Sequence, residues 1–172
     1  EAALDFAHAH SPWGKQQFVG VPGTWLGGSF GDAISWQGIS IFDTRGDELQ
    51  LTPKFVTAFT HVAGAFLRVL VARGVPVEQR EVKLVDEPAL QNATILRKCI
   101  LLFSLTRKVC AAHGGCCIRN SGAYLPPALF PSLSETDIWD VHADGLTASP
   151  HMWKAAQDAT GIRLSVYNNA VD

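Results

Sequence analysis

The chain has 172 residues, of which 47% are hydrophobic and 17% charged, and its formal net charge is −2, from 14 Lys+Arg against 16 Asp+Glu. This length suits one domain with a sizeable core, over residues 1–172, and is too short for two ordinary domains. The balanced charge leaves no basic stripe, which argues against a nucleic-acid or anionic-membrane partner. Arg68, Arg73, Lys98 and Arg107 interrupt the longest apolar stretches, so no membrane span is predicted.

Residues 1–40 are rich in Gly, Trp and Phe and predict loops around short strands at 17–21 and 39–42. Thr52 is a good N-cap and Pro53 suits the first helical position, and apolar residues then recur at helical spacing as far as Gly74. A strand at 81–85 follows, and it ends at Asp86-Glu87-Pro88. This first half therefore predicts a helix and then a strand.

The second half continues the alternation of helices and strands. A helix is expected over 90–113, a strand at 116–119, a strand at 137–141, a helix over 150–160 closed by Gly161, and a strand at 162–167. Such alternation predicts parallel strands with crossover helices, in a doubly wound sheet or a (β/α) TIM-type barrel. The glycines at 27–31 lack the framing strand and helix of a phosphate loop, so we favour the barrel. Because a complete barrel takes about 250 residues, we expect an incomplete barrel or one excised from a longer chain.

The four cysteines, Cys99, Cys110, Cys116 and Cys117, lack the paired spacing of a zinc site. We interpret them as buried thiols, with a disulfide or a metal site as the alternative, which leaves the redox compartment open. Asn92-Ala93-Thr94 is a glycosylation sequon, which matters only in a secreted protein. No layout of a signal peptide stands near the first residue, so any such signal was removed or never existed.

Polar residues follow the predicted strands where each strand stops, and reactive groups of parallel α/β folds gather at those carboxyl ends. Aromatic faces that could stack on a sugar are Trp139 and Trp25. The strand-end candidates are Asp86, Glu87, Asn120, Asp140, His142, Tyr167 and Asn168. Together they predict a sugar-binding site.

The adjacent carboxylates of Asp86 and Glu87 are the sharpest of these features. Two carboxylates held together at a strand end tend to raise one pKa, which makes a proton donor beside a charged neighbour. The alternative is that both residues merely precede a helix, where carboxylates favour the positive end of its dipole.

Lys83-Leu84-Val85-Asp86-Glu87-Pro88 resembles the catalytic strand of glycoside hydrolase family 123. Ordered companions of this motif are Leu51-Thr52-Pro53-Lys54-Phe55 upstream, and downstream Asp137-Ile138-Trp139-Asp140-Val141-His142 and Leu164-Ser165-Val166-Tyr167-Asn168-Asn169. The resemblance spans about residues 36–172 and rests on these short motifs. The family's β-sandwich and final aromatic strand have no counterpart here, which puts in doubt whether this chain alone is catalytically complete.

The resemblance implies a β-N-acetylhexosaminidase that uses substrate-assisted, retaining chemistry, most typically on N-acetylgalactosaminides. Glu87 would then be the acid and base, Asp86 would hold the acetamido N–H, and Tyr167 would donate to the acetamido oxygen. Such enzymes are exceptions to the two-carboxylate geometry, so the adjacency of the pair is no objection. A glycan substrate favours a secreted, periplasmic or lumenal setting, and missing segments of the same barrel would be further partners.

Other constellations are weaker. His8 and His10 lack a third ligand, so neither a metal nor a cofactor is expected. Ser121, His142 and Asp140 are the residue types of a nucleophilic triad, but no G-x-S-x-G elbow surrounds the serine, so we do not expect a triad. The alternatives to a hydrolase are a non-catalytic carbohydrate-binding module and a structural barrel fragment. The exact sugar, its linkage and the oligomeric state stay open.

Overall fold

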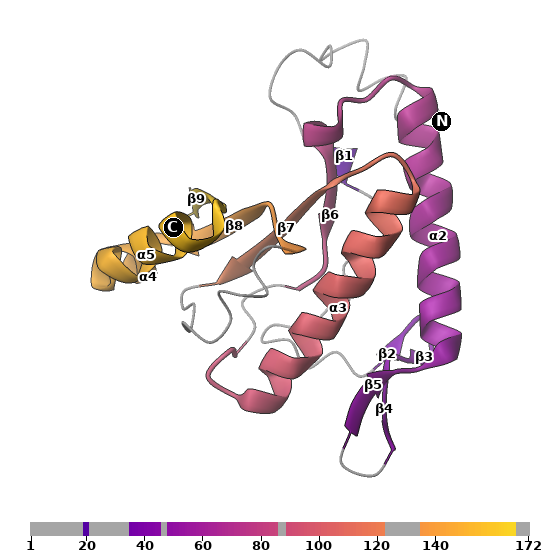
Figure 1. Cartoon of the computed structure of the whole chain (residues 1–172), viewed down its shortest axis with the longest axis horizontal. Coiled ribbons are helices and arrows are strands. Elements are labelled where there is room, and N and C mark those ends of the chain that lie inside the picture. Colours follow the sequence, from indigo (N-terminus) through magenta and orange to yellow (C-terminus); the bar gives the residue numbers. More distant parts are fainter. Residues whose placement is uncertain (1–18, 21–34, 46–47, 86–88, 123–134, 168–172) are drawn as a thin grey trace, which may run out of the picture.

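The computed structural model describes residues 19–20, 35–45, 48–85, 89–122 and 135–167. Its main feature is a five-stranded parallel sheet of β1 (Val19–Gly20), β6 (Arg80–Lys83), β7 (Cys117–Gly122), β8 (Ile138–His142) and β9 (Arg163–Tyr167), in that spatial order (Figure 1). The spatial order follows the chain order without reversal. A doubly wound sheet reverses its strand order at a switch point, whereas a barrel does not. Closure into a barrel stays a prediction, because five strands in chain order are compatible with it without establishing it.

Two small antiparallel hairpins precede the first long helix, and the sequence predicted neither of them. β2 (Ser35–Trp36) pairs with β3 (Ile39–Ser40), and β4 (Phe42–Arg45) pairs with β5 (Glu48–Leu51). The predicted strand at 39–42 is thus divided between the hairpins.

Helix α2 (Pro53–Ala72) begins as the sequence predicts. The Thr52 hydroxyl accepts a hydrogen bond from the Phe55 N–H at 3.2 Å, and Pro53 occupies the first turn, where a missing N–H costs nothing. Gly74, with φ +68°, follows the helix end in the left-handed conformation that favours glycine. A short 3₁₀ turn, η1 (Val77–Gln79), then leads into β6.

Helix α3 (Ala93–Ala112) connects β6 with β7 and lies beside α2 (Figure 1). Between β8 and β9 come α4 (Ala143–Ala148), which the sequence did not predict, and α5 (Pro150–Thr160), which it did. Gly161, at φ +70°, ends α5 as expected. The helices and parallel strands predicted from residue 52 onward are therefore confirmed, with boundaries shifted by a few residues.

The core joins the helices to one face of the sheet. Trp36, Phe55 and Phe59 form an aromatic group with ring centroids 5.5–6.0 Å apart, packed at the hairpin end of α2. Farther along, buried residues of α3 and α5, such as Phe103 and Trp153, belong to the same cluster as the sheet residues Val82, Ile118, Trp139 and Val141. One continuous core therefore supports the sheet from the helical side.

Helix α2 is, among the described residues, the one helix long and apolar enough by length and composition to cross a membrane. Its best window has a mean hydropathy of 1.7, and one third of that window is buried. Arg68, which was expected to interrupt the apolar stretch, lies within the helix. A core helix with a wide apolar face passes the same test, so this property alone does not assign α2 to a membrane.

The cysteines divide into two kinds, which corrects their interpretation as four buried thiols. Cys110, near the end of α3, and Cys116, just before β7, form a disulfide with a Cα–Cα distance of 5.3 Å. Cys99 and Cys117 are buried free thiols, as interpreted. Sequence alone did not reveal the pairing, because it depends on the turn at Gly114 and Gly115, both with positive φ, that returns the chain to the sheet.

Candidate functional site

One face of the sheet is polar, and the strand register defines it. Glu81 lies opposite Cys117, Lys83 opposite Arg119, Ser121 opposite Asp140, and His142 opposite Tyr167. Because side chains alternate across a strand, these residues share one side of the sheet, and the intervening residues point toward the helices. We call this side the polar face, and it consists of Glu81, Lys83, Cys117, Arg119, Ser121, Asp140, His142, Arg163, Ser165 and Tyr167, together with the buried, apolar Ile138.

The polar face is unusual for a parallel sheet. Strands covered by helices on both faces are near-continuous apolar runs, because each face must enter a core. Here the parallel-sheet residues of the core cluster come from the opposite face, and the buried Ile138 is the exception that places an apolar side chain on the polar face among the described strands. The interior of a barrel is one environment in which a parallel sheet could carry such a face.

Arg119 lies at the centre of the polar face and links three adjacent strands. Its Nε and Nη2 donate to the two carboxylate oxygens of Asp140 at 2.6 and 2.8 Å, and its Nη1 donates to Glu81 Oε2 at 3.2 Å. The side chains of Arg119, Glu81 and Asp140 are only 23%, 15% and 9% exposed. We call these three residues the Arg119 cluster. Its fork-like pairing fixes the planes of both groups, and the bonds to Asp140 are the main cause of a raised pKa at Arg119.

His142 and Tyr167 occupy the carboxyl ends of β8 and β9. Their rings meet edge to face, with centroids 5.3 Å apart. His142 Nδ1 also accepts a hydrogen bond from the Asp144 N–H at 3.3 Å, so the imidazole caps α4. This role directs Nδ1 toward the helix. The pair therefore forms a fixed aromatic and polar corner at the strand ends, where the sequence placed both residues.

Asn120 and Asp140 do not lie at strand ends, contrary to expectation, because β7 continues to Gly122 and β8 to His142. Asn120 is fully buried and belongs to the helical side of the sheet, as does Trp139 by the register. The Asn120 Nδ2 donates to Thr136 Oγ1 at 3.5 Å, while its Oδ1 is buried without a partner among the described residues. The Asn120 side chain is therefore on the opposite face of the sheet from Asp140.

Trp139 has no exposed surface, and its indole N–H donates to the Gly122 carbonyl at 3.3 Å. A Cβ at Gly122 would lie 3.2 Å from Trp139 Cζ2, so glycine at this position leaves room for the ring. In this arrangement the indole faces belong to the core, and Trp139 supports the sheet from behind the polar face. It does not present a stacking platform for a sugar.

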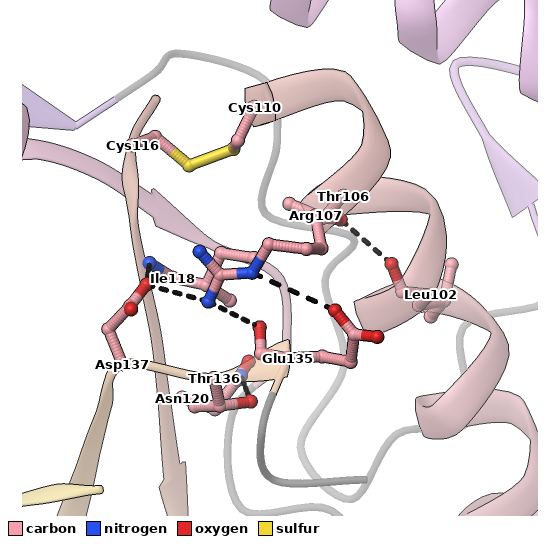
Figure 2. A network of polar contacts seen from close by, with 10 residues as sticks. All are labelled: Leu102, Thr106, Arg107, Cys110, Cys116, Ile118, Asn120, Glu135, Thr136 and Asp137. Atoms are coloured by element: carbon pink, nitrogen blue, oxygen red, sulfur yellow. Dashed lines mark hydrogen bonds and ion pairs between the residues drawn. A yellow bond between two sulfur atoms is a disulfide. The ribbon is translucent and has the colours of Figure 1, made fainter. Parts of the chain in front are cut away.

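A second polar network, which the sequence did not predict, anchors α3 to the start of β8 (Figure 2). Arg107 of α3 donates through Nη2 to Asp137 Oδ2 and to the Glu135 carbonyl, both at 3.0 Å. Asp137 Oδ2 also accepts the Ile118 N–H at 2.7 Å. Figure 2 shows these contacts and the Cys110–Cys116 disulfide on the same side of α3, facing the strands. Both features tie α3 to the sheet, so we regard this network as structural.

Four of the predicted site residues lie outside the described residues: Trp25, Asp86, Glu87 and Asn168. The described chain stops at the buried Val85, next to Asp86, and resumes at Ala89. The residues that lead into the carboxylate pair are therefore placed, and the pair itself is not.

A small cavity of about 120 Å³ lies at the opposite, amino-terminal ends of the strands, lined by Val77, Glu78, Cys116, Cys117, Asp137 and Arg163. Burial is the main cause that raises the pKa of the Cys117 thiol to about 11. A thiol held neutral in this way is a poor nucleophile and a poor metal ligand. Within the described part of the chain, no three His, Cys, Asp or Glu side chains are grouped so as to hold a metal ion.

Comparison of the chain with protein-family models, with curated proteins and with solved structures gives no match in any of the three.

Proposed function

We propose that this chain belongs to a glycoside hydrolase that cleaves terminal β-N-acetylhexosaminides by a substrate-assisted, retaining mechanism. The observation that carries the proposal is the position of β6, the strand that leads into Asp86 and Glu87. It runs parallel to β8 and β9, whose carboxyl ends carry His142 and Tyr167. The carboxyl ends of parallel strands lie at one edge of a sheet, where such folds assemble their reactive groups.

The unreversed strand order supports a barrel segment as the scaffold. In a flat sheet, β6 and β9 are about 14 Å apart, since neighbouring strands are spaced by about 4.8 Å. Curvature of the sheet toward the polar face would bring their ends closer and place a sugar between them. The Arg119 cluster would then form the floor beneath the sugar, and its mutual pairing would keep that floor rigid.

In the proposed reaction, the 2-acetamido oxygen of the substrate attacks the anomeric carbon while the glycosidic C–O bond breaks. The Glu87 carboxyl gives its proton to the leaving oxygen, and Asp86 accepts the acetamido N–H. Glu87 then removes a proton from water, which attacks the anomeric carbon and opens the oxazolinium ring with net retention. Tyr167 would donate a hydrogen bond to the acetamido oxygen, which would lower the activation barrier by about 2–4 kcal/mol if the two groups are aligned.

The test is hydrolysis of chromogenic β-glycosides by the wild-type chain, by Glu87→Gln and by Glu48→Gln. Glu48 is an exposed residue of β5, so its variant makes the same chemical change far from the carboxylate pair in sequence. We expect release from N-acetylgalactosaminide or N-acetylglucosaminide that disappears in Glu87→Gln and persists in Glu48→Gln. Equal rates in both variants would contradict the proposal.

Two substrates separate substrate assistance from an enzyme nucleophile. The matched 2-hydroxy glycoside lacks the acetamido oxygen, so it should not be cleaved by this mechanism. Equal cleavage of the 2-hydroxy and 2-acetamido sugars would rule out substrate assistance while leaving a hydrolase.

The already satisfied pairing of the Arg119 cluster also favours a second candidate, a non-catalytic barrel segment that binds a glycan or only supports the fold. A glycan that binds equally well to the wild type and to Glu87→Gln, without turnover, would support the binding module. Absence of both binding and turnover in folded protein would support the structural role.

A further inference from the structure

The sequon Asn92-Ala93-Thr94 lies at the start of α3, on the surface. Asn92, Ala93 and Thr94 are all exposed, while the flanking Leu90 and Ile95 are buried and anchor the turn on either side. A turn hydrogen bond from the Asn92 N–H to the Ala89 carbonyl, at 2.9 Å, holds the segment before the helix begins. The sequon is therefore accessible and held in one place.

The two polar atoms of the Asn92 side chain have different environments. Oδ1 accepts from the Thr94 and Ile95 N–H groups at 2.9 and 3.3 Å, as an N-cap does. Nδ2 takes no part in these bonds, and its residue is exposed. A substituent on Nδ2 would leave the cap intact, because capping uses only the oxygen.

The disulfide between Cys110 and Cys116 gives separate evidence about the compartment. Disulfides of this kind persist in oxidising compartments and are rare where the cell keeps thiols reduced. The two free cysteines, Cys99 and Cys117, are buried, so an oxidising setting would not readily cross-link them. The pattern of one closed bridge and two protected thiols fits a protein of the secretory route.

We propose that Asn92 is an N-glycosylation site. The Asn92 Nδ2 forms a bond to the anomeric carbon of an oligosaccharide, the bond from that carbon to a lipid-linked pyrophosphate breaks, and the amide loses one proton. The donor is a lipid-pyrophosphate oligosaccharide, and the reaction needs no oxidant. The proposal does not depend on the hydrolase function, because it uses neither the polar face nor the carboxylate pair.

The test is secretion of the full chain from animal cells behind a cleavable leader, followed by removal of N-glycans with an amidase. We expect the wild type to move faster on a gel after treatment and to carry aspartate at position 92 by peptide mass spectrometry. Asn92→Asp keeps a capping oxygen but lacks the amide nitrogen, so it should be secreted without the shift. Thr94→Ser keeps the sequon and the shift, whereas Thr94→Ala loses both.

Two results would overturn the inference. One is a wild-type protein whose Asn92 peptide is unmodified, whether taken from the medium or from the cells' microsomes. The other is the finding of four free thiols in wild-type protein purified without reductant, since this would remove the evidence for an oxidising compartment. Microsomal analysis keeps the test valid for variants that are poorly secreted.

Discussion

Replacement of Asp140 by asparagine should be more costly than replacement of Glu81 by glutamine, although both remove one carboxylate from the Arg119 cluster. Asp140 makes two hydrogen bonds with Arg119, at 2.6 and 2.8 Å, and is only 9% exposed. Glu81 makes one, at 3.2 Å. The difference in number, length and burial of the bonds sets the expected order.

The magnitude follows from what each variant leaves behind. Removal of one partner from a fully buried ion pair costs about 3–5 kcal/mol, mostly because a charge is left unpaired. Arg119 is 23% exposed and retains Glu81, so Asp140→Asn should lower the free energy of unfolding by about 2–3 kcal/mol. Glu81→Gln leaves the fork between Arg119 and Asp140 intact and should cost about 1 kcal/mol.

Urea denaturation at pH 7, followed by circular dichroism, measures both free energies of unfolding. Asp158→Asn is the matched control, because it makes the same Asp-to-Asn change in the exposed pair of Lys154 and Asp158 on α5. That variant should change stability by no more than about 0.5 kcal/mol. If Asp140→Asn cost no more than Asp158→Asn, the Arg119 cluster would not be a rigid element of the sheet, and our account of its burial would be refuted.

Three further changes test other parts of the fold. Replacement of Cys110 and Cys116 by alanine should lower stability by about 2 kcal/mol, because the bridge joins residues six apart and closes only a short loop; an unchanged urea midpoint would contradict this. Gly64→Ala should destabilise by about 1 kcal/mol, since a Cβ would lie 2.4 Å from His113 Nε2, and should instead stabilise a His113→Ala background, as measured by thermal melts. Because the Cys117 pKa rises from 9.0 to about 11 on folding, stability should be full below pH 9 and fall as pH rises toward 11, and Cys117→Ala should flatten that profile.

Local patterns determined most of the secondary structure from residue 52 onward. Thr52 with Pro53 specifies the start of α2 because the cap and the missing N–H act within one turn of helix. Gly161 ends α5 for a similarly local reason. The position after the last helical residue adopts the left-handed conformation, which glycine takes without steric cost. The repeated exchange of helical and strand periods also predicted parallel strands with helical crossovers.

Only the tertiary structure decided which side chains meet. The register of β7 against β8 places Arg119 beside Asp140 and turns Asn120 and Trp139 to the helical side, although the sequence predicted Asn120, Trp139 and Asp140 alike as site residues and did not select Arg119. A shift of one residue would exchange the two faces, because side chains alternate with a period of two. Periodicity in one strand cannot set that register, since it depends on packing against the neighbouring strands and helices. The same holds for Cys110 and Cys116, whose pairing required the turn between α3 and β7.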